Sequence, residues 1–292
     1  MSTRLEIPVE GGSLAAFRLG AGGGVQPVLA IHGITSSYAS WVAVGRALGE
    51  RAALAAVDLR GRGDSNGLRG PYGLASHVRD MLAVLDALGL ERAVVAGHSL
   101  GAYIAAKLAA EHPERVRSLV LVDGGLRIPG TAEADPQAFL DAFLGPALAR
   151  LRMRFSSRDQ YREWWRAHPA IAAGDVDEAD LAVYADHDLI GEPPEMRSAV
   201  LEEAVRADAA DLFASGDDAD ALAVPATLLC AARGLQDGPD PMQPLGLAQA
   251  WAAGAPELRE VIAVPDVNHY TLVLGRAGSD EVGDAIASAA GG

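Results

Sequence analysis

The sequence contains a single cysteine and few basic residues. Cys230 stands alone, so the chain forms no intramolecular disulfide and does not point to an oxidising compartment. Lys and Arg number 24 against 39 Asp and Glu, which gives a formal net charge of −15 at pH 7. Nucleic acids and anionic membranes both attract clustered basic side chains, so this composition argues against either partner.

Long hydrophobic runs and metal or phosphate motifs are also missing. No segment approaches the roughly 20 apolar residues of a membrane span, and the start, MSTRLEIPVEGG, lacks the apolar core of a signal peptide. The chain has no P-loop, no H-E-x-x-H motif and no Cys/His cluster. We therefore expect a cytoplasmic protein without metal or cofactor. The oligomeric state is left open by the sequence.

Buried strands and helices alternate in the first part of the chain. Short apolar runs predict strands at 27–31, 53–58, 93–96 and 118–122. The apolar positions of residues 74–90 recur at helical spacing and predict an amphipathic helix. Continuous apolar strands separated by helices are typical of a parallel sheet that is covered on both faces.

A helical region interrupts this alternation. Residues 126–215 have no convincing buried strand and hold most of the larger aromatic side chains. Strand signals return at 225–231 and 259–264. We therefore expect an α/β core formed by residues 1–125 and 216–292, with residues 126–215 inserted as a helical cap.

A polar Gly-His-Ser sequence interrupts the apolar stretch AVVAGHSLGAYIAAKLAA at residues 93–110. The stretch predicts a buried strand, a tight turn and a helix, with Ser99 at the turn between Gly97 and Gly101. Two glycines let strand and helix approach closely and permit a strained backbone. Ser99 would then lie at the carboxyl end of a strand and at the N-terminus of a helix, which favours developing negative charge.

Four motifs together resemble the α/β-hydrolase fold superfamily, over essentially the whole chain. Residues 97–101 match the G-x-S-x-G elbow in the expected strand–turn–helix context. The His-Gly-Ile at 32–34 resembles an oxyanion turn, and Asn268-His269-Tyr270 resembles the position of the catalytic histidine. Residues 58–65 resemble the D-x-R-G-x-G-x-S loop of these enzymes, whose charged side chains we expect to anchor the backbone. The resemblance implies a mostly parallel central sheet with helices on both faces.

The resemblance also implies a catalytic triad. Ser99 would be the nucleophile, and His269 the base that takes its proton. The acid that orients the imidazole is ambiguous. Asp237, in the loop after the strand that follows the cap, is preferred; Asp123 and Asp240 are the alternatives.

The remaining site residues follow from the same resemblance. The backbone N–H groups of Ile34 and Leu100 would form the oxyanion hole. Trp164 and Trp165, in the cap, are predicted to line an apolar substrate pocket.

The expected reaction is hydrolysis of an ester-type bond through an acyl-enzyme, by a carboxylesterase or a lactonase. The expected partner is a small-molecule substrate of small to medium size and largely apolar character. Carbon–carbon bond hydrolases, thioesterases, amidases and perhydrolases use the same triad and stay open. Ser99 argues against epoxide hydrolases and haloalkane dehalogenases, which carry Asp at that position. A non-catalytic receptor for a small ligand on the same fold is the alternative of another class.

Overall fold

The fold is built on one eight-stranded sheet in the order β1-β2-β4-β3-β5-β6-β9-β10. The computed structural model describes residues 3–20, 26–130 and 136–291. The strands are β1 (Thr3–Val9), β2 (Gly12–Leu19), β3 (Val28–Ile31), β4 (Leu54–Val57), β5 (Ala93–His98), β6 (Val116–Val122), β9 (Ala226–Arg233) and β10 (Arg259–Asn268). The pairs from β4 to β10 are parallel, which confirms the predicted fold class.

The antiparallel hairpin of β1 and β2 was not predicted from the sequence. Val9 of β1 pairs with Gly12 of β2 next to the turn of the hairpin, and β2 also pairs with β4 in the antiparallel direction. Most side chains of β1 are exposed, so this edge strand lacks the apolar run by which the buried strands were recognised.

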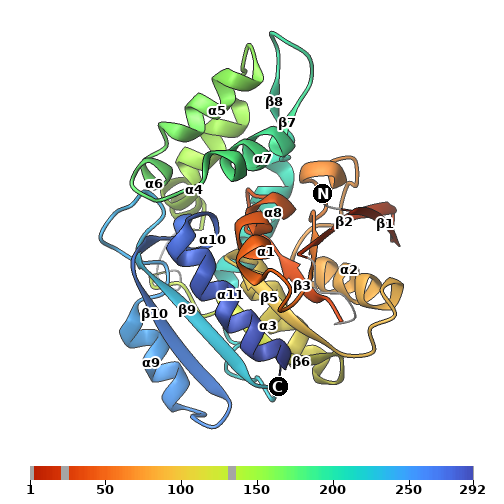
Figure 1. Ribbon diagram of the computed structural model, residues 1–292, viewed down its shortest axis with the longest axis vertical. Coiled ribbons are helices and arrows are strands. Elements are labelled where there is room, and N and C mark those ends of the chain that lie inside the picture. Colours follow the sequence, from red (N-terminus) through yellow and green to blue (C-terminus); the bar gives the residue numbers. More distant parts are fainter. Residues whose placement is uncertain (1–2, 21–25, 131–135, 292) are drawn as a thin grey trace.

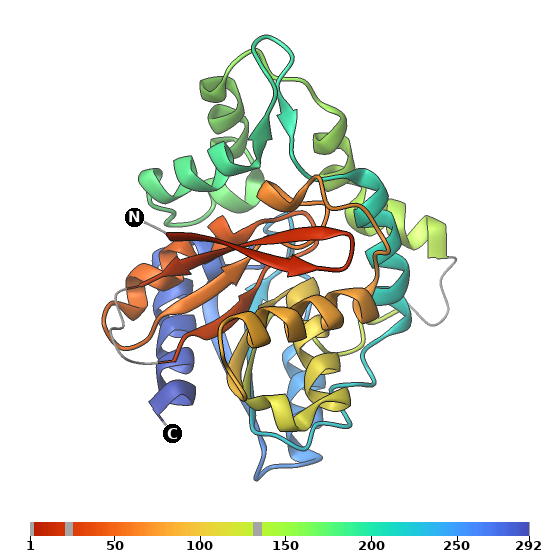
Figure 2. The same cartoon turned by 90° about the vertical axis from the view of Figure 1, so that its right-hand side faces the viewer.

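Helices cover both faces of the sheet (Figures 1 and 2). Leu29 and Ile31 of β3 pack into the apolar core beneath α2, α3 and α9, whereas Val28 and Ala30 pack into the second core beneath α1 and α11. This alternation follows from the two-residue period of a strand. The covering helices are α1 (Val42–Leu48), α2 (Leu74–Ala87), α3 (Leu100–Glu111), α9 (Leu245–Ala253) and α11 (Arg276–Gly291).

The residues between β6 and β9 form helices and a very short hairpin. They comprise α4 (Pro136–Arg152), α5 (Arg158–Arg166), α6 (Pro169–Ala172), α7 (Glu178–Asp188), β7 (Leu189–Ile190), β8 (Arg197–Ser198) and α8 (Glu202–Ala214). Figure 1 shows α5, α6, α7 and the hairpin at the top of the molecule, beyond α10 (Thr271–Leu274). These elements therefore stand at the end of the sheet where β10 leads into α10.

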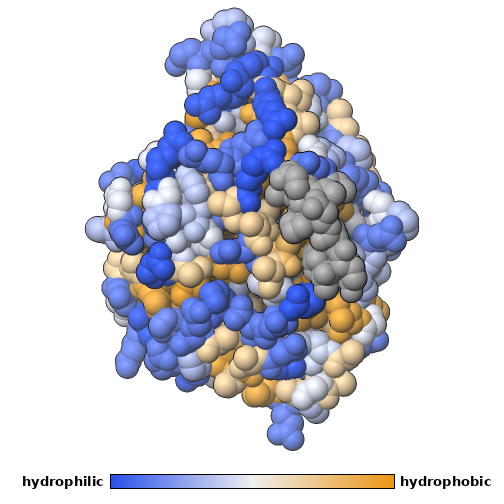
Figure 3. Space-filling model, turned by 180° about the vertical axis from the view of Figure 1, so that it is seen from behind, coloured by the Kyte–Doolittle hydropathy of each residue, from blue (hydrophilic) through white to orange (hydrophobic). Residues whose placement is uncertain are grey.

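The surface is largely hydrophilic on the face opposite to that of Figure 1, with smaller hydrophobic areas between the polar residues (Figure 3). This agrees with the net charge of −15. Among the described residues, no helix is both long enough and apolar enough to cross a lipid bilayer.

The predicted strand–turn–helix around Ser99 is present and unusually tight. Ser99 has φ 54° and ψ −121° between β5 and α3. A Cβ atom added to Gly97 would lie 2.1 Å from the carbonyl oxygen of Gly101, and one added to Gly101 would lie 2.1 Å from that of Ile31. Only glycine at both positions lets α3 pack this closely on β3 and β5.

We predict that Gly101→Ala destabilises the protein by more than about 4 kcal/mol, because the new methyl group would displace α3 from the sheet. Urea unfolding followed by circular dichroism measures the effect. Gly246→Ala in α9 is the matched control: apart from its chain neighbours and its own helix backbone, no described atom lies within 4 Å of the added Cβ, and the variant should gain about 0.5–1 kcal/mol. A stability of Gly101→Ala within 1 kcal/mol of the wild type would contradict this account.

Candidate active site

A buried imidazole–carboxylate pair lies at the carboxyl end of the sheet. His269 follows β10, and its Nδ1 lies 2.7 Å from Oδ2 of Asp123, which follows β6. Asp123 is fully buried, and its other oxygen accepts a hydrogen bond of 3.2 Å from the N–H of Ala231. Because a carboxylate only accepts, Nδ1 of His269 carries the proton, and Nε2 is free to accept another.

The preference for Asp237 as the partner of His269 is wrong. The carboxylate of Asp237 accepts a hydrogen bond of 3.0 Å from the side-chain amide of Asn268 and forms an ion pair of 3.1 Å with Arg233. Asp237 lies in a turn closed by a hydrogen bond between Gly234 and Gly238, at φ 60°. That turn directs the carboxylate to the neighbouring residues of its own sheet edge.

The alternative Asp123 takes the position beside His269 because β6 is the immediate neighbour of β5 in the sheet. The third alternative, Asp240, is exposed and lies at the rim of a cavity. The structure thus brings together the imidazole of His269 and the carboxylate of Asp123.

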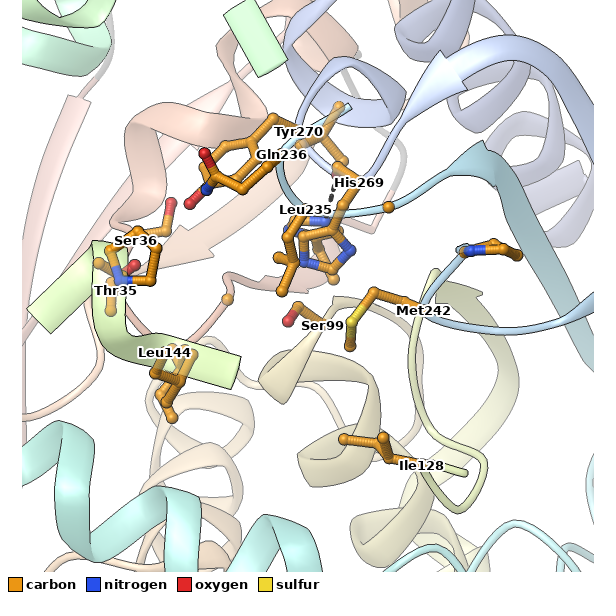
Figure 4. Close-up of a pocket in the computed structure, with 18 of the residues that line it drawn as sticks. Thr35, Ser36, Ser99, Ile128, Leu144, Leu235, Gln236, Met242, His269 and Tyr270 are labelled. Carbon is orange, nitrogen blue, oxygen red and sulfur yellow. Dashed lines mark hydrogen bonds between the residues drawn. The ribbon is translucent and has the colours of Figure 1, made fainter. Parts of the chain in front are cut away.

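Ser99 and His269 line the same cavity of about 710 Å³ (Figure 4). His98, the residue before Ser99, donates from Nε2 to the backbone carbonyl of His269 at 3.0 Å, which ties the elbow to the loop that carries the imidazole. Burial and the neighbouring His269 hold the pKa of His98 well below its usual value, so this ring stays neutral. Ser99 and His269 share no hydrogen bond in this structure, a common state for a catalytic pair without substrate.

The turn after β3 packs directly against Ser99. A Cβ atom on Gly33 would lie 3.2 Å from Cβ of Ser99. The backbone N–H groups of Ile34 and Leu100 have no hydrogen-bond partner within the described part of the chain. Both candidate oxyanion donors are therefore free beside Ser99.

Buried side chains hold three consecutive carbonyl groups of this turn. Nδ1 of His32 lies 2.7 Å from the oxygen of Gly33. Nε and Nη2 of Arg62 donate to the oxygen of Ile34 at 3.1 and 3.0 Å, and Nη2 of Arg150 donates to the oxygen of Thr35 at 3.0 Å. Since a peptide unit is planar, fixing the carbonyl of Gly33 also fixes the N–H of Ile34.

The role of His32 requires a neutral ring. Its Nε2 accepts a hydrogen bond of 3.0 Å from the N–H of Leu59 while Nδ1 faces the carbonyl of Gly33. One nitrogen therefore accepts and the other donates, as only neutral imidazole does. Complete burial lowers the pKa of His32 to about 4, so the ring stays neutral at physiological pH.

Arg62 is neutralised inside the protein by Asp208 of α8. Their charged groups lie 2.7 Å apart, and both side chains are fully buried. His77 of α2 lies 3.0 Å from the same carboxylate, and Arg62 with its neighbour His77 holds the pKa of Asp208 well below its usual value. The sequence did not reveal this pair: Arg62 occupies a variable position of the loop motif, and Asp208 lies far along the chain.

The charged side chains of residues 58–65 anchor backbone and neighbouring helices, as expected. Asp58 accepts from the N–H groups of Tyr38 and Asp64, and Arg60 forms a bidentate pair with Asp80 at 2.7 and 2.6 Å. Among the described residues, one group could surround a cation: ligand atoms of Asp58, Asp64 and His187 lie within 4.8 Å of one another. Asp58 and His187 instead bond each other at 2.7 Å, which already satisfies both.

The prediction that Trp164 and Trp165 line the substrate pocket is wrong. Trp165 is 1% exposed and packs against Tyr161, Tyr184 and the guanidinium of Arg150. Trp164 packs against the same apolar core. A helix that carries two adjacent tryptophans places both in the packing of its own region, because their large surfaces are needed to hold short helices together.

Other side chains form the wall of the cavity. Ile128, Leu144, Leu235, Met242 and Tyr270 are among those shown in Figure 4. Most of them lie in helices and loops that have no motif of their own. The sequence therefore offered no signal that would have identified them.

An eight-stranded, mostly parallel sheet with a serine at a strained strand–helix turn, beside a buried His–Asp pair, defines a protein of the α/β type with a nucleophile elbow. A family model described as alpha/beta hydrolase fold matches residues 26–275. The chain belongs to this family.

Individual relatives share only part of the sequence. An "Uncharacterized protein Mb2734" of Mycobacterium bovis is 36% identical over 110 residues, which are 38% of this chain and 32% of that protein. A "Putative carbamate hydrolase RutD" of Azorhizobium caulinodans is 40% identical over 108 residues, 37% of this chain and 41% of that protein. The crystal structure of E-2-(acetamidomethylene)succinate hydrolase covers both chains completely at a TM-score of 0.81 and 20% identity, which shows a shared fold.

We predict that Asp123→Asn lowers kcat for a p-nitrophenyl ester by about 10³–10⁴-fold, because the imidazole of His269 loses the acceptor that fixes its tautomer. Asp237→Asn is the matched control and should stay within about tenfold of the wild type, since its partners are Asn268 and Arg233. Steady-state kinetics of both purified variants decide between the two carboxylates. The opposite order of effects would restore Asp237 as the acid.

Proposed function

We propose that this protein is a serine hydrolase that cleaves ester-type bonds of small to medium, uncharged and largely apolar substrates, as a carboxylesterase or lactonase does. The observation that carries the proposal is the position of Ser99, at a strained elbow in the wall of a cavity shared with the His269–Asp123 pair. A free Nε2 on His269 is what a general base for a serine hydroxyl requires.

The reaction would proceed in two halves. Oγ of Ser99 attacks the carbonyl carbon while Nε2 of His269 takes its proton, and the N–H groups of Ile34 and Leu100 stabilise the oxyanion. The imidazolium, stabilised by Asp123, gives the proton to the leaving alcohol. His269 then activates a water molecule, which releases the acid from Ser99.

The cavity supports a substrate of small or medium size. Its volume of about 710 Å³ lies in the range of small-molecule sites. Leu144 of α4, Tyr184 of α7 and Phe213 of α8 contribute to its wall. This supports residues 126–215 as a cap on a core of residues 1–125 and 216–292.

The charge of the cavity wall favours uncharged substrates. Among the described residues that line it, none is Lys or Arg, and Asp240 is the one carboxylate. Residues outside the described part of the chain include no Lys or Arg either. The structural neighbour is named for a succinate derivative, whereas this cavity supplies no cation to pair with a substrate carboxylate.

Thioester, carbon–carbon and perhydrolytic chemistry share this triad and remain alternatives within the same class. One of the structural neighbours is a thioesterase domain from the curacin biosynthetic pathway, at a TM-score of 0.72 and 18% identity. Parallel assays with a thioester and an oxygen ester of the same acyl group rank these reactions. The cytoplasmic location stays a prediction from the sequence.

We predict that a fluorophosphonate probe labels the wild-type protein stoichiometrically at Ser99, since an activated serine hydroxyl attacks phosphorus as it attacks a carbonyl. Intact-protein and peptide mass spectrometry measure the extent and the position of labelling. Ser99→Ala should show no labelling and at least about 10³-fold lower turnover of p-nitrophenyl butyrate. A protein that binds small esters without labelling or turnover would instead be the non-catalytic receptor.

We predict that kcat/KM for p-nitrophenyl butyrate exceeds that for the hemisuccinate of p-nitrophenol by at least about 100-fold, because burying a carboxylate in a cation-free cavity is costly. Gln236→Arg places a cation at an exposed position of the cavity wall and should narrow this ratio by about tenfold. Gln236→Met, which adds no charge, should leave the ratio unchanged. Equal rates for the two esters in the wild type would refute the charge preference.

A further inference from the structure

We propose that Arg150 is a positioning residue that joins the helical cap to the oxyanion turn, so that the turn has its active geometry only when the cap is docked. The inference rests on the proposed function, because it concerns the oxyanion hole of that site. The observation that carries it is one buried guanidinium shared between the cap helices and the carbonyl of Thr35.

One terminal nitrogen of the Arg150 guanidinium bonds side chains of the cap. Arg150 lies near the end of α4, and its side chain is 1% exposed. Its Nη1 contacts the carboxylate of Asp188, the hydroxyl of Tyr161 at 2.5 Å and the hydroxyl of Ser198 at 3.3 Å. These three partners come from α7, α5 and β8, so the guanidinium holds the cap elements together.

The other terminal nitrogen of Arg150 bonds the backbone of the core. Nη2 donates to the carbonyl of Thr35 at 3.0 Å, in the turn that carries the candidate donor Ile34. The guanidinium is planar, so its position relative to Asp188 also sets the position of the Thr35 carbonyl. Asp188 thereby acts on the turn through Arg150.

The turn depends on this bond because its other side-chain supports hold different carbonyl groups, those of Gly33 and Ile34. Arg62 holds the carbonyl of Ile34, and Arg62 is itself fixed by Asp208. Without Arg150, the peptide unit after Thr35 is held by no other side chain of the described residues at its carbonyl. That unit also contains the N–H of Ser36, which donates to the carbonyl of Gly33 at 3.2 Å, and the carbonyl of Gly33 shares its own planar unit with the N–H of Ile34. Rotation of the unit after Thr35 would therefore break the bond between Ser36 and Gly33 and loosen the N–H of Ile34.

Arg150 does not belong to the residues that line the cavity. A substrate therefore has no direct contact with its charge, and its removal should not weaken ground-state binding. A role in the turn instead affects the transition state, which is where the oxyanion develops. The expected signature is a loss in kcat at nearly constant KM.

The test compares Arg150→Lys, Arg150→Met/Asp188→Asn and the control Arg162→Met. Lys keeps the charge but lacks the fork that reaches both Asp188 and Thr35, and the double variant leaves no unpaired buried charge. Arg162 joins α5 to α7 through Asp186 at 2.8 Å and has no contact with the turn. It therefore reports what a loosened cap alone does.

Kinetics with p-nitrophenyl butyrate and inhibition by an alkylboronic acid, a mimic of the tetrahedral state, provide the readout. Both Arg150 variants should lose about 10–100-fold in kcat, keep KM within about threefold and bind the boronic acid more weakly by the same factor. Arg162→Met should keep kcat and boronic acid affinity within about threefold. Thermal unfolding verifies that all three proteins are folded.

Two results overturn the inference. Folded Arg150 variants with wild-type kcat, or with a change in KM alone, would show that Arg150 does not act on the oxyanion turn. An equal loss in Arg162→Met would attribute the effect to general loosening of the cap. If fluorophosphonate labels Ser99 in the wild type while the Arg150 variants keep full activity, the inference fails alone; a wild type that is neither labelled nor active overturns the proposed function as well.

Discussion

The close backbone contact of α3 with β3 and β5 is the constraint on which the rest of the site depends. Gly97 and Gly101 leave no space for a side chain between helix and strand, and this contact forces Ser99 into its left-handed conformation. A Cβ atom on Gly124 would also lie 2.6 Å from the carbonyl oxygen of Ser99. Ser99 is thus held by backbone on two sides, and in the proposed mechanism every other catalytic group has to be brought to it.

Among the described residues, three arginines of this acidic chain are buried, and two of them, Arg62 and Arg150, hold the backbone of the candidate oxyanion turn. Each of the two is neutralised by one carboxylate, and each also donates to a carbonyl of the candidate oxyanion turn. A buried guanidinium without a carboxylate would be costly, so Asp208 and Asp188 are as necessary as the arginines. Among the described residues that line the cavity, none is Lys or Arg, so the two buried arginines support the turn without adding charge to the cavity wall.

Local sequence patterns were sufficient to predict the parallel strands of the sheet and the strand–turn–helix around Ser99. Buried strands such as β5 are short apolar runs. The glycines around Ser99 are required by close backbone contacts, and the motif that indicates this requirement spans only five residues. The choice between Asp123 and Asp237 could not be made in this way. It depends on which carboxylate the neighbouring side chains already occupy, and the amide of Asn268 occupies that of Asp237.

The pocket residues and the buried arginines were beyond prediction for a related reason. Trp165 is apolar and aromatic whether it faces a substrate or the interior of the cap, so residue type alone does not separate these two positions. The pair of Arg150 and Asp188 links α4 to α7 and both to a turn near the N-terminus, with no pattern in the sequence that marks the contact. The wrong prediction for Trp165 and the missed contact of Arg150 with Asp188 both concern the helices between β6 and β9. In this region, neither a sheet nor a sequence motif determines how the helices pack.

The pairing of His269 with Asp123 has a consequence for the cavity. Because Asp123, directly after β6, is the carboxylate that bonds His269, the loop after β9 does not supply the acid of the proposed triad. It contributes Leu235, Gln236 and Met242 to the wall of the cavity instead.

The hydrogen bond between Asp237 and Asn268 anchors this loop to the residue directly before His269. Asp237 forms no hydrogen bond with the imidazole, but it fixes the position of this part of the cavity wall relative to His269. The carboxylate partner of His269 and this part of the cavity wall therefore follow different strands, β6 and β9.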